Sequence, residues 1–158
     1  MIFWLNRRVE RALESYLKMI LPGSVRVYRS ADMTPRQFPC AVIRAHQNQR
    51  YGGDVYACNV MLVSIIVMTE FARVVNATAQ LVNTFEETEE AAVSVVLDAL
   101  YVDDLAAQLE ATGTDGVSFA YAAIGSDGDP AVTSQSTEAD TVSQVEIPLV
   151  IHAGAKEL

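Results

Sequence analysis

The residues best suited to acid–base or nucleophilic chemistry are few and far apart. In 158 residues, His46 and His152 are the only imidazoles, and Cys40 and Cys58 are the only thiols. A serine, threonine or cysteine nucleophile needs a base within hydrogen-bond reach. Each histidine falls at the end of a predicted strand, where a structural or exposed role is more common than a catalytic one. We therefore expect no catalytic residue and predict that the protein is not an enzyme.

The acidic clusters resemble metal or catalytic sites only superficially. The neighbours Asp103 and Asp104 lie in a segment predicted to be exposed, which does not favour general acid–base catalysis by a carboxylate pair. The glutamate run between residues 86 and 90 lacks the Asp/Asn/Gly ligand spacing of a calcium loop. The two cysteines form no CxxC pair, and we interpret them as reduced, apolar thiols. We expect neither a metal nor a cofactor.

Length and composition predict a single domain over residues 1–158. With 51% hydrophobic residues, a chain of this length can bury a core without disulfides or metal. Charged residues such as Arg7, Arg8 and Glu10 interrupt the N-terminal apolar segment, so it does not resemble a targeting sequence. The longest apolar run, Val60 to Met68, is too short to span a bilayer. We expect a soluble, non-secreted protein that does not interact with membranes.

The charge is divided unevenly along the chain. Residues 1–50 hold nine basic and three acidic residues, a net charge of +6, whereas the remainder holds two basic and seventeen acidic residues, a net charge of −15. If the halves occupy different surfaces, this division suits head-to-tail contact between copies, although a merely solvated acidic surface is the alternative. The basic residues lack the interleaved aromatic residues of a nucleic-acid stacking platform, which disfavours tight sequence-specific nucleic-acid binding.

The sequence predicts a mixture of helices and strands, and these elements must position the charged and titratable residues. Val9, Leu13, Tyr16, Leu17 and Ile20 recur at helical spacing and predict an amphipathic helix over about residues 3–20. The fold class we predict is α+β, an antiparallel sheet packed against helices in the order helix, strands, helices, strands. The expected strands cover residues 24–28, 38–46, 51–69, 117–124 and 141–152, and helical spacing covers about 71–110.

A tight hairpin is predicted about Gly52 and Gly53, since both can adopt positive φ. It would place Cys40 opposite Ile65 and Cys58 opposite Gln47, so the cysteines would not face each other. The strand that follows is apolar on both faces from residue 60 onward. We therefore expect it to be covered on both sides, either by helices on one face and another subunit on the other, or by a helix on each face within one chain.

Three further local features concern the second half of the chain. A helix is expected to start near Thr84 to Thr88, which would put the glutamates in its first turn. Either Asp103 or Asp104 could cap a short helix over residues 105–109. The polar stretch Gly125 to Thr137 is predicted to be a long, mobile connection, which is either an arm that docks on a neighbour or simply a flexible loop.

The order of elements resembles the tail terminator and tail-completion (neck) proteins of long-tailed bacteriophages. The resemblance covers nearly the whole chain. It departs from the family pattern in the acidic insert between the helices and in the Gly125 to Thr137 loop. It rests on the helix Val9-x-x-Ala12-Leu13-x-x-Tyr16-Leu17, the strand Val25-Arg26-Val27-Tyr28, the segment Phe38-Pro39-Cys40-Ala41-Val42-Ile43, the Gly-Gly turn, the strand ending Val67-Met68-Thr69, the alanine-rich helix, and the closing strand Val145 to Ile151.

The resemblance implies a non-enzymatic structural virion protein, located in the tail or neck and assembled in the host cytoplasm. It implies a self-assembled, hexameric ring that caps the tail tube, ends tube polymerisation and offers the head–tail joining surface. The implied partners are further copies of itself, the tail tube protein and a head-side neck or connector protein. Genomic DNA would pass through the channel without specific binding, and an acidic lumen would repel its phosphates. The residues we place in subunit or partner contacts are Arg7, Arg8, Arg11, Arg50, Glu86, Glu87, Glu89, Glu90, Asp127 and Asp129.

Two alternatives remain open at this point. Another neck component, such as a head-completion or connector protein, would share the size, charge and virion context but would bind portal rather than tube protein. A cellular α+β protein-interaction domain is the other, and it predicts a monomer or dimer with a ligand groove.

Overall fold

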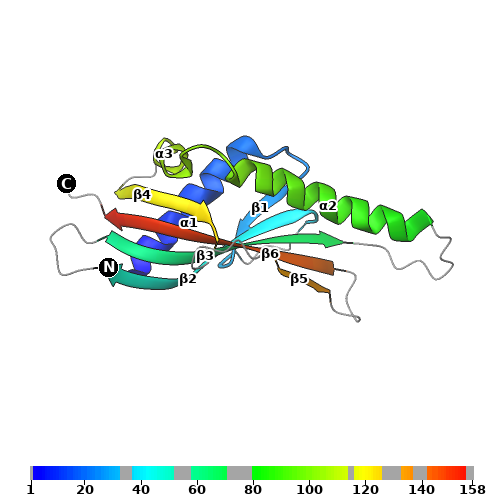
Figure 1. Ribbon diagram of the computed structural model, residues 1–158, viewed down its shortest axis with the longest axis horizontal. Coiled ribbons are helices and arrows are strands. Elements are labelled where there is room, and N and C mark those ends of the chain that lie inside the picture. Colours follow the sequence, from blue (N-terminus) through cyan, green and yellow to red (C-terminus); the bar gives the residue numbers. More distant parts are fainter. Residues whose placement is uncertain are drawn as a thin grey trace.

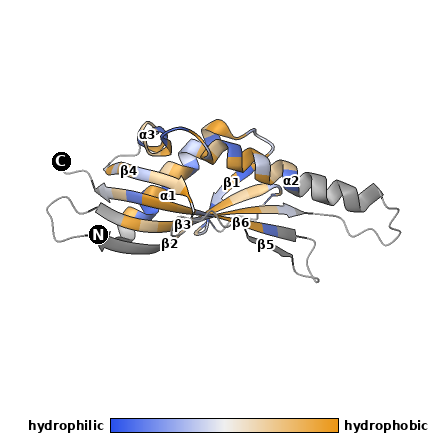
Figure 2. Ribbon diagram, viewed as in Figure 1, coloured by the Kyte–Doolittle hydropathy of each residue, from blue (hydrophilic) through white to orange (hydrophobic). Residues whose placement is uncertain are grey.

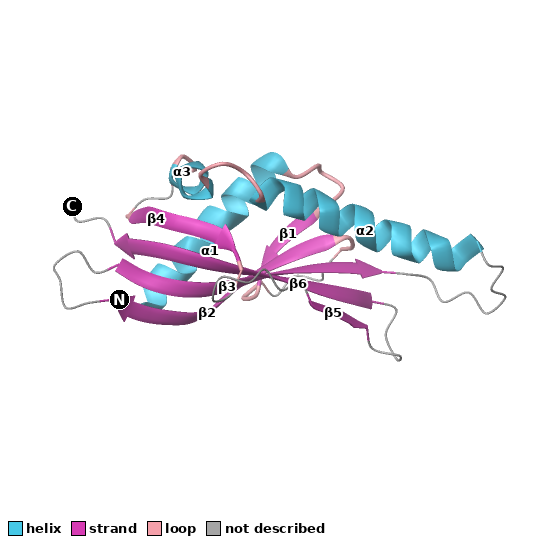
Figure 3. Ribbon diagram, viewed as in Figure 1, coloured by secondary structure: helices cyan, strands magenta, loops and turns pink. Residues whose placement is uncertain are grey.

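The chain folds into one twisted sheet with a layer of helices on one of its faces (Figure 1, Figure 3). This arrangement confirms the α+β class and the predicted order of helix, strands, helices and strands. The computed structural model describes residues 2–32, 37–51, 58–70, 80–113, 116–125, 133–136 and 142–155.

The helices and strands lie close to the predicted ranges. Strand β4 has the predicted bounds, whereas β2 is longer than expected and β3 begins later. The elements, in chain order, are α1 (Ile2–Ile20), β1 (Arg26–Arg29), β2 (Cys40–Tyr51), β3 (Cys58–Glu70), α2 (Gln80–Leu100), α3 (Leu105–Glu110), β4 (Val117–Ile124), β5 (Thr133–Ser136) and β6 (Val142–Ala155).

Helix α1 forms because its apolar residues recur at helical spacing along one side. Val9, Leu13 and Leu17 are completely buried, while Arg8, just before Val9, and Arg11, between Val9 and Leu13, are exposed. Figure 2 shows hydrophilic and hydrophobic stretches alternating along α1. The helix therefore packs one side against the sheet and presents a basic side to solvent.

Among the described residues, six strands form the sheet, in the order β1-β2-β3-β6-β4, with β5 also paired to β6. All pairings are antiparallel except β1 with β2, which is parallel. The expectation of an antiparallel sheet is therefore wrong for this one pair. Arg26, the first residue of β1, pairs with Cys40, the first residue of β2, and Arg29 pairs with Ile43, so the two strands run in the same direction.

The register between β2 and β3 differs from that of a tight Gly52-Gly53 hairpin. Cys40 pairs with Met68 rather than Ile65, and Cys58 pairs with Tyr51 rather than Gln47. The last pair leaves residues 52–57, which lie outside the described residues, as the connection. An irregularity between Ala45 and Gln47 adds one more residue to β2. The expectation that the cysteines do not face each other is confirmed.

The main core lies between the helices and one face of the sheet. In β3, Met61, Val63, Ile65 and Val67 are at most 1% exposed and belong to a single cluster with buried residues of α1, α2 and α3. Because one cluster contains all three helices, the described helices cover the same face. The alternative of a helix layer on each face is therefore wrong for the described part of the chain.

The starts of helices α2 and α3 show where the neighbouring acidic residues lie relative to the prediction. Helix α2 begins at Gln80, and its first turn contains no acidic residue. The expected start near Thr84 to Thr88 is thus wrong, because the helical periodicity already present at Leu81 and Val82 extends the helix towards the N-terminus. Asp104, rather than Asp103, caps α3: its carboxylate accepts the backbone N–H of Ala107 at 3.2 Å.

The predicted long connection after β4 contains a strand. Thr133–Ser136 form β5 and pair with residues 143–146 of β6. For these four residues the prediction of an arm that docks on a neighbour, or of a flexible loop, is wrong, because their backbone groups extend the sheet of the same chain. Residues 126–132 and Thr137, the rest of that connection, lie outside the described residues, as do Asp127 and Asp129.

Candidate subunit interface

The predicted basic residues of α1 lie together on the solvent side of the helix. Arg7, Arg8 and Arg11 are all exposed. The guanidinium of Arg8 reaches the turn before β4, where its Nη1 lies 2.7 Å from the position that a Cβ on Gly116 would occupy. Gly116 has a φ of +84°, so both its backbone conformation and this close approach favour glycine. The basic face therefore borders the α3–β4 turn.

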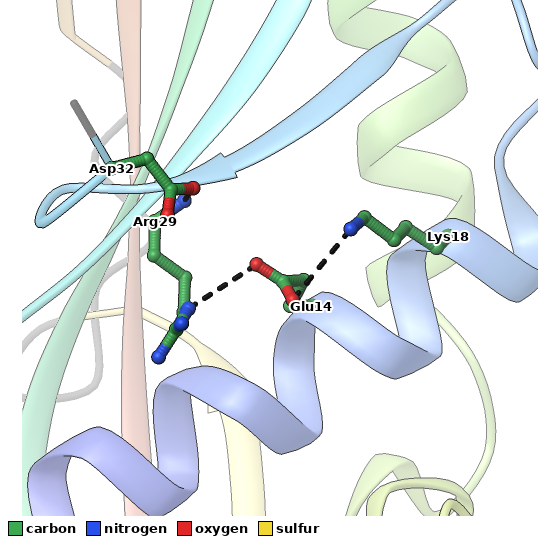
Figure 4. Close-up of polar contacts among 4 residues, drawn as sticks. All are labelled: Glu14, Lys18, Arg29 and Asp32. Carbon is green, nitrogen blue, oxygen red and sulfur yellow. Dashed lines mark hydrogen bonds and ion pairs between the residues drawn. The ribbon is translucent and has the colours of Figure 1, made fainter. Parts of the chain in front are cut away.

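A second polar group joins α1 to the end of β1 (Figure 4). Glu14 Oε2 lies 3.2 Å from Arg29 Nε, and Glu14 Oε1 lies 3.6 Å from Lys18 Nζ. The first contact is an ion pair without hydrogen-bond geometry. The backbone N–H of Arg29 donates to Asp32 Oδ2 at 2.7 Å. These contacts fix α1 across β1 and, being partly exposed, contribute little net stability.

Glu10 is the one buried acidic residue among the described side chains, with 7% of its surface exposed. Burial raises the pKa of its carboxyl, although hydrogen bonds from the backbone of Ala45 and from Ser30, and the nearby charges of Arg29 and Arg7, act in the opposite direction. Its Oε2 is buried without a hydrogen-bond partner. Sequence reasoning missed this residue, since its position beside Val9 on the buried side of α1 is the only signal for it.

The predicted glutamates lie on α2, far from the arginines of α1. Glu86, Glu87, Glu89 and Glu90 fall in the N-terminal half of α2, which extends to the right-hand end of the molecule in Figure 1, whereas α1 begins near the left-hand end. Of these four, only the side chain of Glu90 is described, and it is exposed. The structure therefore does not bring the predicted basic and acidic residues together within one copy.

A further acidic group surrounds α3. Asp98, Asp103, Asp104 and Glu110 are all exposed. Residues 74–155 contain no lysine or arginine, so no basic residue of this segment offsets these negative charges. Helix α3 packs beside β4. The exposed acidic residues of the α3 region therefore accompany β4, together with the Arg8 guanidinium beside Gly116 at the start of that strand.

The sheet face opposite the helices, the open face, is only partly covered. At one end, Cys40, Val42 and Met68 are buried in a small second cluster beneath Phe38 and Tyr28. In its middle, the Ser64 hydroxyl donates to Glu146 Oε1 at 2.7 Å. Towards the other end, Val60, Leu62 and Val150 are only half-buried.

An aromatic pair lies on the open face beyond Val150. Tyr121 is 50% exposed, and its ring centre lies 5.1 Å from that of His152, which is half-buried. His152 thus packs against an aromatic ring. The side chain of His46 and that of Arg50 are not described, although the backbone of both residues belongs to β2.

The described residues contain no group of three or more histidine, cysteine, aspartate or glutamate residues placed to hold a metal ion. None of the helices in the described ranges is both long and apolar enough to cross a membrane.

No protein-family model matches the chain, and no curated protein matches it. Among solved structures, 26 chains match its fold. One is a chain from the virion of a native gene transfer agent particle, which aligns with a TM-score of 0.50 at 13% sequence identity. The alignment covers 95% of this chain and 94% of that chain. At this identity the similarity shows a shared fold, and it extends over nearly the full length of both chains.

Proposed function

We propose that this chain is a structural protein of a phage-like virion and that it acts by assembling into a ring. The observation that carries the proposal is the shared fold with a chain of a gene transfer agent virion, aligned over nearly all of both chains. The resemblance of the sequence to tail terminators favours the same class of particle. The finer role follows from that resemblance: a non-enzymatic, hexameric ring that caps the tail tube and joins it to the head.

The distribution of charge supports assembly of copies in a head-to-tail manner. A closed ring of identical subunits requires each copy to offer two different, complementary surfaces. The arginines of α1 and the glutamates of α2 lie towards opposite ends of the molecule, whereas the acidic group around α3 lies near the basic face in the same copy. Opposite charges on separate surfaces attract neighbouring copies and disfavour stacking of like surfaces.

The proposed partners are further copies of the chain, a tail tube protein and a head-side neck protein. DNA would pass through the centre of the ring. With a net charge of −9, most of the protein repels phosphate groups, which would let DNA slide without adhering. The protein would then act in the tail or neck of the virion.

Light scattering coupled to size exclusion, at several salt concentrations and with or without the tail tube protein of the same particle, tests this function. We expect a ring-sized species that either forms at low salt or forms when tube protein is added, and negative-stain images should show annular particles. Binding to the portal in place of the tube protein would overturn the terminator role in favour of a connector. A monomer under all these conditions would overturn the ring itself.

A further inference from the structure

At the end of the sheet that contains β4, the two outermost strand edges have no described strand paired with them. There, β2, β3, β6 and β4 lie side by side, as the pairs Gln47–Leu62, Leu62–Val150 and Val150–Ala123 show. Strand β1 pairs with β2 only as far as Ile43, and β4 pairs only with β6 among the described strands. The outer edge of β2 beyond residue 45 and the outer edge of β4 therefore meet no described strand.

The backbone of β2 shows where its outer edge becomes available. Arg26 N–H donates to Pro39 C=O and Ser30 N–H donates to Ile43 C=O, so odd-numbered residues direct their backbone groups outward in this part of β2. The next outward N–H, that of Ala45, is taken by the carboxylate of Glu10. The bulge after Ala45 then shifts the alternation by one residue. Beyond it, Asn48 and Arg50 occupy the outward positions.

We propose that the outer edge of β2, centred on Asn48, pairs with the outer edge of β4 from a second copy of this chain. The proposal rests on the proposed ring and specifies one of its contacts. Strands β2, β3, β6 and β4 are successively antiparallel. Because their number is even, β2 and β4 run in opposite directions. Copies related by rotation about an axis roughly along the strands therefore bring β4 of one beside β2 of the next in antiparallel orientation, which suits backbone pairing.

Charge complementarity favours a second copy as the partner. Arg50 is at the outward position beyond Asn48, and it pairs with Asn59, a position on the same face of the sheet as the helices. The β4 edge is accompanied by Asp103, Asp104 and Glu110 of the α3 region. Since the two edges belong to different sides of the molecule, the contact is heterologous and repeats from copy to copy, as a ring requires.

Cysteine cross-linking tests this pairing directly. Asn48 pairs with Met61 and Ala122 pairs with Ile151, and both partners belong to the core on the helix face, so the two positions lie on the same face of the sheet. Within one copy they are three strand spacings apart, about 14 Å. A disulfide bridges Cα atoms no more than about 7 Å apart, so a bond between these positions must join two copies.

The experiment uses full-length chains with Cys40→Ala and Cys58→Ser. A protein with Asn48→Cys is mixed with one carrying Ala122→Cys, and a second mixture uses Ile124→Cys to allow for a different register. Under assembly conditions and mild oxidation we expect covalent dimers in at least one mixture and in neither protein alone. As the matched control, Ser94→Cys on the exposed side of α2 replaces the β4 cysteine and should give none.

A proline variant provides an independent readout. Asn48→Pro removes the backbone N–H that points outward and keeps every N–H that donates to β3. Asn48→Ala keeps the outward N–H as well. We expect Asn48→Pro to abolish the ring-sized species and Asn48→Ala to retain it, with both monomers melting within a few degrees of the parent protein. If Asn48→Pro forms rings normally, the edge pairing is wrong. If rings form but neither cysteine mixture gives a cross-link, the edge pairing is also wrong. In both cases the proposal of a ring still stands. Failure of the unaltered chain to form any ring, even with tube protein, would overturn both proposals.

Discussion

The carboxylate of Glu10 accepts the backbone N–H of Ala45, just beyond the last pair between β1 and β2. A side chain from α1 thereby occupies the place that a strand carbonyl would take. The contact joins the first helix to the point where β2 becomes the edge of the sheet. It does so at the cost of burying an ionisable group whose second oxygen has no hydrogen-bond partner.

This burial makes the stability of the protein depend on pH. Because the pKa of Glu10 is raised in the folded state, the folded protein binds a proton more readily than the unfolded chain does. The contribution of Glu10 is fully favourable below its unfolded pKa, near 4.5, and is lost as pH rises through the raised folded pKa. Glu10→Gln removes this titration. We expect the free energy of unfolding of the variant, relative to the parent, to increase as pH rises from 4 to about 8.

Urea denaturation of both proteins at several pH values measures this difference. The comparison does not depend on whether glutamine is itself favourable at this position, because only the change with pH is tested. Parallel stability curves over the whole range would show that the Glu10 carboxyl titrates alike in the folded and unfolded chains.

The hydroxyl of Tyr16 ties α1 to the C-terminal end of α2 by donating to the carbonyl of Ala99. Tyr16 is 1% exposed, and burial also raises the pKa of its phenol. Tyr16→Phe keeps the ring in the core but leaves the carbonyl without this donor. We expect a loss of about 1–2 kcal/mol in the free energy of unfolding, measured by denaturation. A loss below about 0.3 kcal/mol would show that another donor replaces the hydroxyl.

The sequence allowed the strongly periodic elements to be predicted, because their signal is local. The spacing of Val9, Leu13 and Leu17 identified α1, and the alternation from Val117 onward identified β4 with its correct bounds. The basic residues of α1 were also correctly expected at the surface. These features depend only on which residues an element buries, and that choice is written in the period of its apolar residues.

The features that were missed depend on contacts between distant segments. Strand β5, with the sequence Thr-Ser-Gln-Ser, has no apolar alternation and is a strand only because β6 pairs with it. The β2–β3 register was missed because the pairing ends at Tyr51 and Cys58 and not next to a two-residue turn; the bulge after Ala45 changes the register by one further residue, and no local residue pattern required either feature. Glu10 was passed over because a carboxylate on a charged helix is usually solvated, whereas here β2 supplies its hydrogen-bond donor.

Asp104 provides a test of the cap on α3. It has a φ of 55°, in the left-handed region, and its carboxylate accepts the N–H of Ala107. Asp104→Ala removes the acceptor and places alanine in a strained conformation, so we expect a loss of about 1–2 kcal/mol in stability. Asp104→Asn keeps an acceptor and tolerates the left-handed region, and it should lose less. Asp103→Ala is the matched control on the neighbouring residue; an equal loss there would refute the assignment of the cap to Asp104.

Neighbouring residues of β3 test the difference between the two faces of the sheet. Ile65 is fully buried under the helices, whereas Ile66 on the open face is half-buried. We expect Ile65→Ala to destabilise the monomer by about 2–5 kcal/mol and Ile66→Ala by clearly less. The measurement is thermal or chemical denaturation under conditions that keep the protein monomeric. Equal losses would show that the open face is as tightly packed as the helix face.

Charge reversal on α1 tests whether its basic face acts in the proposed assembly. Arg8→Glu with Arg11→Glu reverses two exposed charges and spares Arg7, whose charge favours ionised Glu10. We expect the double variant to remain folded, with an unchanged circular dichroism spectrum, and to lose the ring-sized species at low salt, because its face now repels the acidic surfaces of other copies. Arg26→Glu, which reverses one exposed charge on β1 and changes the net charge by half as much, controls for charge reversal outside the basic face and should assemble more nearly like the parent. Because salt screens the interactions between charges on different copies, the two variants should differ less in the amount of ring-sized species as salt rises towards 1 M. Assembly of the double variant at parental salt dependence would exclude the basic face from the contact.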